Sequence, residues 1–259
     1  MNLIRRILSI KKYKFMLLQL IKRDFKVRYR GSILGVLWSV LNPLLNMIVL
    51  SIVFGQVFKA VDNYKMYLLS GLLIFNFFSE GTNLGLTSVV SNFGLLTKVY
   101  FPKVVLPLSK VFSSSINFFM SMIAFFIISV FMGIEMWWGY IFIIYLVITL
   151  ILFTSGISFI LATLQVFMRD IQHLYSVLIV IWMYGTPIIY PIDVIPENYL
   201  FIYKVNPLYI FITFLREITL YNSIPQLSNF VLCALWGLGV FVLGAIVFVR
   251  SQNKFIYYT

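Results

Sequence analysis

Long apolar stretches without charged residues dominate the chain, and short polar or basic segments separate them. The clearest are Ile33 to Phe58, Met136 to Met168, Ile171 to Ile192 and Gln226 to Val249. About 20 apolar residues in a helix cross the ~30 Å of hydrocarbon in a bilayer. The pattern therefore predicts an all-α membrane protein with six transmembrane helices, at about 33–58, 66–92, 104–132, 138–167, 171–190 and 226–249.

A different pattern precedes the first predicted span. Between Tyr13 and Phe25 apolar residues recur at roughly helical spacing, with lysine and arginine at the remaining positions. This is typical of an amphipathic helix lying on the membrane surface. We predict such an interface helix from Tyr13 to Arg30, within a cytoplasmic region 1–30, with a solvated basic tail as the alternative. Its cations are Lys22, Arg23, Lys26, Arg28 and Arg30.

The segment from Pro191 to Pro225 is too apolar for a plain loop, and its four prolines break it too often for a simple span. Prolines stop helices and set turns, while tyrosines prefer the membrane interface. We expect one or two short helices that enter the outer leaflet and return, covered by protein. One additional interfacial helix on the outside is the alternative.

Composition excludes an ordinary soluble fold, because 61% of the residues are hydrophobic and only 11% are charged. Lysine and arginine gather in the short cytoplasmic loops of membrane proteins. With the amino terminus inside, sixteen of the twenty lie inside and four outside, so both termini, including a tail at 250–259, are predicted to be cytoplasmic. The basic residues then lie beside membrane lipids, and we expect no nucleic-acid partner despite the net charge of +12.

Two charged residues fall inside predicted spans, where a charge requires a cavity, a partner or a place near the interface. Lys110 lies near the start of its span, so its side chain is expected to extend to the headgroups. Glu80 lies centrally. It faces either water or a protein partner, or it contacts a substrate or coupling element.

Sites for covalent chemistry are missing from the sequence. One histidine, His173, and one cysteine, Cys233, predict neither a metal site nor a disulfide. No phosphate-binding loop of the form G-x-x-x-x-G-K-[ST] occurs, so we expect no cofactor in this chain. Energy for any transport must therefore come from a partner or from an ion gradient. Glu80 is the main candidate for ion coupling, which makes an ion-driven carrier a weak alternative.

Three motifs in order along the chain resemble the permease subunits of polysaccharide and polyol phosphate ABC exporters. The first is the run from Arg23 to Trp38 followed by Asn42-Pro43, the second is Leu95 to Lys103 with Leu106-Pro107, and the third is Thr186 to Pro191 with Asn206-Pro207-Leu208. These are the O-antigen, capsule and teichoic acid permeases. The resemblance covers nearly the whole chain, which is read as one permease domain with a bundle at 33–249.

The resemblance implies a homodimer paired with two copies of a nucleotide-binding subunit that holds ATP and magnesium. It also implies that the interface helix and the first cytoplasmic loop rest on that ATPase. The expected coupling residues are Leu96, Lys98, Tyr100, Phe101, Pro102 and Lys103. Without the resemblance, the two lysines would be ordinary topology anchors.

In that family a sugar polymer passes between the two permease copies along aromatic residues of spans one and five. The matching positions here are Trp38, Phe54, Tyr175, Trp182, Tyr184 and Tyr190. The expected function is export of a lipid-linked polysaccharide, most simply O-antigen, across the inner membrane. Teichoic acid or capsule export, a small-molecule exporter, and a membrane enzyme or scaffold of lipid-linked glycan assembly are the alternatives.

Overall fold

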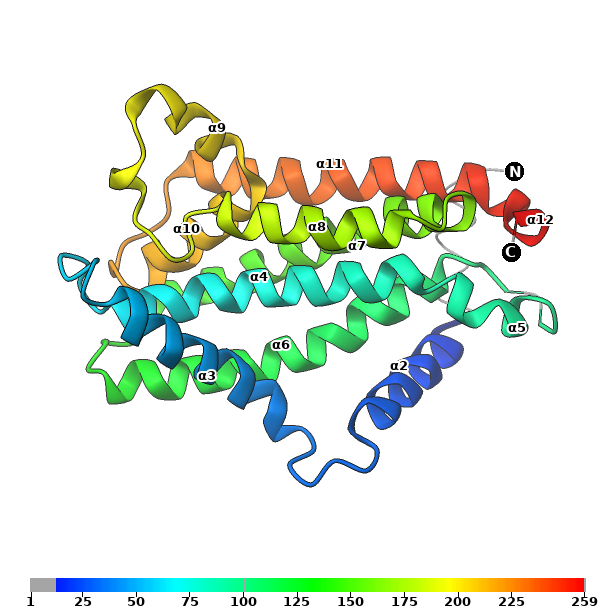
Figure 1. Cartoon of the computed structure of the whole chain (residues 1–259), viewed down its shortest axis with the longest axis horizontal. Coiled ribbons are helices and arrows are strands. Elements are labelled where there is room, and N and C mark those ends of the chain that lie inside the picture. The colour runs from blue at the N-terminus through cyan, green and yellow to red at the C-terminus, as the bar shows by residue number, and fades with distance from the viewer. Residues whose placement is uncertain (1–12, 100, 259) are drawn as a thin grey trace.

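A computed structural model describes residues 13–99 and 101–258, with Ile256 described by its backbone alone, and every regular element in these residues is helical. The long helices lie side by side along one axis (Figure 1). The α-helices are α2 Lys14–Tyr29, α3 Leu37–Phe54, α4 Tyr64–Thr87, α5 Phe93–Leu96, α6 Val105–Phe131, α7 Phe142–Phe167, α8 Ile171–Tyr184, α9 Leu200–Val205, α10 Pro207–Thr219, α11 Leu227–Ser251 and α12 Phe255–Tyr258. The prediction of an all-α protein is confirmed.

Four of the described helical segments are both long and apolar enough to cross a membrane. They are Leu37–Phe54, Val105–Phe131, Trp138–Phe167 and Leu227–Lys254, and they match four of the six predicted spans. Helix α4 has the required length, with 24 residues, but polar side chains such as Asn76 and Glu80 lower its apolar character. It is largely enclosed by protein, because 17 of its 24 residues are buried.

The fifth predicted span, 171–190, is shorter than expected because α8 ends at Tyr184. Gly185 closes the helix, and Pro187 has no backbone N–H with which to continue it. Residues 186–189 form an irregular segment that is completely buried. The apolar run in the sequence therefore has two parts, an apolar helix of 14 residues, too short to cross the bilayer alone, and a buried turn.

Helices α7 and α11 pack with their backbones in direct contact. A β-carbon added at Gly244 would collide with the backbone of Gly156, and one added at Gly156 would collide with Val240. Small residues permit this approach, which helices in lipid use because lipid is as apolar as their side chains. Helix α4 packs on α7 in the same way, with Gly81 against Thr154 and Gly85 against Ser158.

The segment between α8 and α11 folds over the end of the bundle where α9 and α10 lie (Figure 1). Asn206 caps α10 by accepting a hydrogen bond from the Leu208 N–H at 3.1 Å, and Pro207 occupies the first turn. Ten of the 13 residues of α10 are buried, mainly against α4, α7 and α11. Two short helices are thus present in this segment, but α10 has the expected protein cover and α9 has no buried residue.

Arg216 in α10 is only 3% exposed and has no acidic partner in the described chain. Its guanidinium donates to the carbonyl of Pro187 at 2.9 Å, of Tyr67 at 3.1 Å and of Ile188 at 3.2 Å, and it lies 3.4 Å from the centre of the Tyr67 ring. Carbonyl dipoles and an aromatic face thus satisfy this cation. It fixes the buried turn after α8 against α4.

We predict that Gly244→Val weakens the fold, because the added methyl groups would force α11 away from Gly156. Overpacking of this kind costs about 1–3 kcal/mol. The melting temperature of the purified protein in detergent should fall. Gly239→Val on the same helix is the control, since a β-carbon there meets nothing within 4 Å, and equal melting temperatures for the two variants would contradict the packing account.

Candidate functional site

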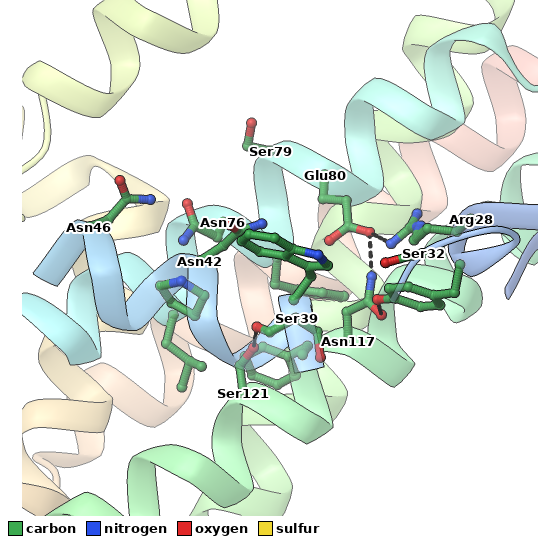
Figure 2. A pocket seen from close by; sticks show the side chains of 16 residues that line it. Arg28, Ser32, Ser39, Asn42, Asn46, Asn76, Ser79, Glu80, Asn117 and Ser121 are labelled. Carbon is green, nitrogen blue, oxygen red and sulfur yellow. Dashed lines mark hydrogen bonds and ion pairs between the residues drawn. The ribbon is translucent and has the colours of Figure 1, made fainter. Parts of the chain in front are cut away.

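A polar cavity of about 670 Å³ lies between α2, α3, α4 and α6 (Figure 2). Its size falls in the range of about 300–1,000 Å³ that is usual for small-ligand pockets. Its lining is rich in amides and hydroxyls: Ser32, Ser39, Asn42, Asn46, Asn76, Ser79, Asn117 and Ser121. Such a lining is unusual inside a bundle of apolar helices, and it makes the cavity the candidate site.

Polar residues at helical spacing build each wall. Ser39, Asn42 and Asn46 are three and four residues apart on α3, so they share one face. Asn76 and Glu80 do the same on α4, and Asn117 and Ser121 on α6. Asn117 is twelve residues into α6, about 18 Å along a helix of 1.5 Å rise. The cavity therefore lies well inside the bundle.

Pro43 interrupts the backbone hydrogen bonds of α3 beside the cavity. It has no N–H to donate to the carbonyl of Ser39, four residues earlier. The hydroxyl of Ser121 on α6 donates to that carbonyl at 2.7 Å instead. This contact satisfies the freed acceptor and joins α3 to α6.

Glu80 closes the side of the cavity next to α2. Its carboxylate pairs with Arg28 and accepts a hydrogen bond from the Asn117 amide at 2.9 Å. The Asn117 carbonyl oxygen in turn accepts from the Tyr29 hydroxyl at 2.7 Å. Of the two expectations for Glu80, the structure shows the protein partner. Figure 2 places this network at one end of the cavity and Asn46 at the other.

Helix α2 is present with nearly the predicted bounds, but polar contacts hold it against α6 and α4. Lys110 pairs with Asp24 at 2.8 Å, and Arg23 donates to Asn92 at 2.9 Å. The expectation that Lys110 extends toward headgroups is wrong, because an acidic partner lies within its reach. Arg28, one of the predicted interface-helix cations, binds Glu80. Lys22, Lys26 and Arg30 are exposed.

The six predicted conduit residues do not share one environment. Trp38 lines the cavity and is 40% exposed, and Tyr184 is 62% exposed. Tyr175 is buried and donates to the Thr82 hydroxyl at 2.6 Å, and Trp182 donates to Asn206 at 3.1 Å.

Phe54 and Tyr190 complete this set and are partly buried. Phe54 packs on Phe58, with ring centres 6.4 Å apart. The hydroxyl of Tyr190 donates to the carbonyl of Tyr184 at 2.7 Å. Whether any of the six residues meets a polymer stays a prediction.

The predicted coupling residues lie at the opposite end of the bundle from α9 and α10. Leu96 and Phe101 are buried in one apolar cluster with Leu20 of α2 and Phe248 of α11. Lys98 is exposed and Pro102 is half-buried, while Tyr100 lies outside the described residues.

Lys103, the last predicted coupling residue, has partners within this chain. It donates to the Gln252 carbonyl at 2.7 Å and lies 5.6 Å from the ring centre of Phe255. Burial lowers the pKa of its ammonium group. This lysine therefore joins the start of α6 to the end of α11, and Lys98 is the more accessible of the two loop cations.

Sequence reasoning missed Asn42, Asn46, Asn76 and Asn117 as site residues. The signal was present, because each recurs with a serine or a second polar residue at spacing three or four within an apolar span. Amides inside a lipid-crossing helix are costly unless satisfied. A search for polar faces on the predicted spans would have found them.

Comparison with known proteins agrees with this architecture. Residues 16–220 match the family described as ABC-2 type transporter. The chain belongs to this family. It is therefore a multi-pass membrane protein and the membrane component of an ABC transporter, a class whose members work with an ATPase.

Curated relatives resemble this ABC-2 chain along most of its length. An O-antigen export system permease protein, RfbA, from Klebsiella pneumoniae is 35% identical over 242 residues, covering 88% of this chain and 92% of the relative. A second Klebsiella pneumoniae protein of that name is 32% identical over 249 residues, covering 94% and 95%. The Myxococcus xanthus RfbA is 34% identical over 197 residues, 76% of each chain.

We predict that Glu80→Gln destabilises the docking of α2, because it leaves Arg28 without its counter-ion at a half-buried site. Breaking one side of such a pair costs more than an exposed pair, for which about 0–1 kcal/mol is typical. Protease cleavage after Arg30 should become faster in membranes. The charge-swapped double variant Arg28→Glu with Glu80→Arg should recover part of the protection, and an unchanged cleavage rate in Glu80→Gln would contradict the role of the pair.

We also predict that Ser121→Ala lowers the thermal stability of the purified protein. The substitution leaves the Ser39 carbonyl without a donor, at a cost of about 1–3 kcal/mol for a buried group. Adding Pro43→Ala restores a backbone N–H opposite that carbonyl, so the double variant should be more stable than Ser121→Ala alone. A further loss of stability in the double variant would refute this account.

Proposed function

We propose that this chain is the permease subunit of an exporter that moves lipid-linked O-antigen across the inner membrane. The similarity to two O-antigen export permeases over about nine-tenths of both chains carries the proposal. Matches of that extent include the helices, the loops between them and the segment between α8 and α11. The site supports it too, since a hydroxyl- and amide-lined cavity suits a sugar better than an apolar drug.

In the proposed topology, α3, α4, α6, α7, α8 and α11 cross the membrane and both termini are cytoplasmic. The end that carries α5 and α12 is then the cytoplasmic end, in agreement with the lysine and arginine distribution. Helix α8 is about 21 Å long at 1.5 Å per residue, and the buried turn at 186–189 completes its crossing. Helix α10 is the re-entrant helix in the outer leaflet, covered by α4, α7 and α11, and the exposed helix α9 precedes it at the interface.

Two copies of an ATPase subunit, each binding ATP and magnesium, drive the cycle. Their contacts are α2 and the segment from Leu96 to Lys103. Because Leu96 and Phe101 share an apolar cluster with Leu20 of α2, a push on this segment moves α2 with it, while Phe248 in the same cluster belongs to α11. The chain itself carries out no covalent chemistry.

The conduit forms between two copies of the chain, beside α3 and α8. Helix α3 is the least covered of the long apolar helices, with 11% of its span buried, against 56% in the span that contains α7. Trp38 and Tyr184 are the predicted conduit residues with the most accessible rings. Tyr175 and Trp182 shape the wall from within the subunit. The passing polymer and the surrounding lipids are the remaining partners.

We predict that a strain lacking its own O-antigen permease regains surface O-antigen when it expresses this chain with the matching ATPase subunit. Polymer at the cell surface, detected by antibody on intact cells, is the measurement. An ATPase variant that cannot hydrolyse ATP should abolish the signal. Full surface polymer without any ATPase, or polymer retained inside with an intact ATPase, would overturn the proposal.

For the coupling segment, the double variant Lys98→Glu with Pro102→Gly should lower ATP-driven export several-fold while the protein still reaches the membrane. It reverses an exposed charge and loosens the turn before α6. Lys204→Glu, an exposed lysine in α9 at the other end of the bundle, is the matched control. Normal export in the double variant would show that the ATPase contact lies elsewhere.

A further inference from the structure

We infer that the cavity between α2, α3, α4 and α6 is a binding site for uncharged sugar rings of the exported polymer. This inference rests on the proposed function and adds a ligand chemistry and a location to it. Three features carry it: carboxamides without partners, a charge-neutral lining and one accessible aromatic face.

Asn42 and Asn46 are exposed and Asn76 is partly buried, and none of the three has a side-chain hydrogen bond to a described residue. Each amide offers one acceptor oxygen and two N–H donors. Polar groups at this depth must be satisfied by protein, by water or by a ligand, because hydrocarbon offers neither donors nor acceptors. Sugar hydroxyls, which both donate and accept, match all three amides.

The network at the other end of the cavity shows what a satisfied amide looks like here. Asn117 accepts from Tyr29 and donates to Glu80, so both ends of its amide are used. Asn117 is therefore assigned a structural role. The three amides on α3 and α4 that have no partner are free to bind a ligand.

The charge of the lining argues against a phosphate group. Arg28 and Glu80 are the charged side chains among the described residues that line the cavity, and they neutralise each other. Recognition of phosphate uses Arg or Lys whose donors point at the anion. One guanidinium nitrogen of Arg28 binds Glu80 and the two charges cancel, so the lining as a whole suits a neutral ligand.

Trp38 supplies the apolar face that a sugar ring requires. Phe77 and Phe118 also line the cavity, but they pack on each other with ring centres 4.8 Å apart. Trp38 is 40% exposed and lies one helical turn before Asn42, so its ring and that amide lie on one side of α3. C–H groups of a pyranose contact the ring while its hydroxyls reach the amides.

The direct test places a photocrosslinker in the cavity of the working transporter. Ser79→benzoylphenylalanine, at a lining position one turn from Asn76 that leaves the three amides in place, is expressed with the ATPase subunit in cells whose O-antigen carries a radiolabelled neutral sugar. Irradiation should give a permease adduct that holds the label and loses it on periodate treatment. Val49→benzoylphenylalanine, on an exposed part of α3 outside the lining, is the control and should give at least five-fold less labelled adduct.

Substitutions at Asn76 test whether the ligand of the cavity is uncharged. Asn76→Leu and Asn76→Lys should each reduce surface polymer at least five-fold while membrane levels and basal ATP hydrolysis of the complex are kept. Asn83→Leu is the matched control, because this amide lies two turns along the same helix and donates to the Ser79 carbonyl instead of lining the cavity. Retained or increased export in Asn76→Lys, with loss in Asn76→Leu, would indicate an anionic headgroup and overturn the inference.

The outcomes separate the two levels of the proposal. Normal surface polymer in the crosslinker strain with no labelled adduct at position 79, or with adducts to phospholipid only, overturns the sugar site and leaves the export function standing. If the unmodified chain supports no O-antigen export with its ATPase, the proposed function fails and the sugar site fails with it.

Discussion

Polar groups inside this bundle have to be satisfied by the protein, by water or by a ligand, because the surrounding hydrocarbon supplies no partner. Pairing of Glu80 with Arg28 and of Lys110 with Asp24 brings α2 alongside α4 and α6. The same requirement places the Arg216 guanidinium among carbonyl oxygens and the Ser121 hydroxyl on the carbonyl freed by Pro43. These contacts determine where α2 lies, how the turn after α8 is held, and how α3 packs on α6.

Hydropathy was enough to place the long helices, because a helix that crosses lipid is written in the sequence as one continuous apolar run of about the required length. It failed at α8, because apolar residues at 186–189 are buried by protein and not by lipid. Charge placement was predicted less well. Lys110 and Arg28 looked like surface cations, and only the three-dimensional packing brings Asp24 and Glu80, which are distant in sequence from them, within reach.

The candidate site was visible in the sequence only in pieces. Each helix shows a polar face by its own spacing, but a cavity requires that the faces of α3, α4 and α6 point at one another, and periodicity says nothing about rotation between helices. Aromatic residues drew attention for a different reason, the resemblance to polysaccharide permeases. Of these, Trp38 belongs both to that set and to the cavity.

The glycine contacts of α7 and α11 have a mechanical consequence. They make this pair a stiff frame, since sliding either helix would separate backbones already in contact. Helix α3, by contrast, touches only part of α4 and α6, and it joins α2 through a loop whose Gly31 and Gly35 have positive φ and open space around them. Movement is therefore expected at the loop between α2 and α3. In the proposed cycle, force delivered through α2 moves α3 relative to the α7–α11 pair and changes the volume of the cavity between α2, α3, α4 and α6.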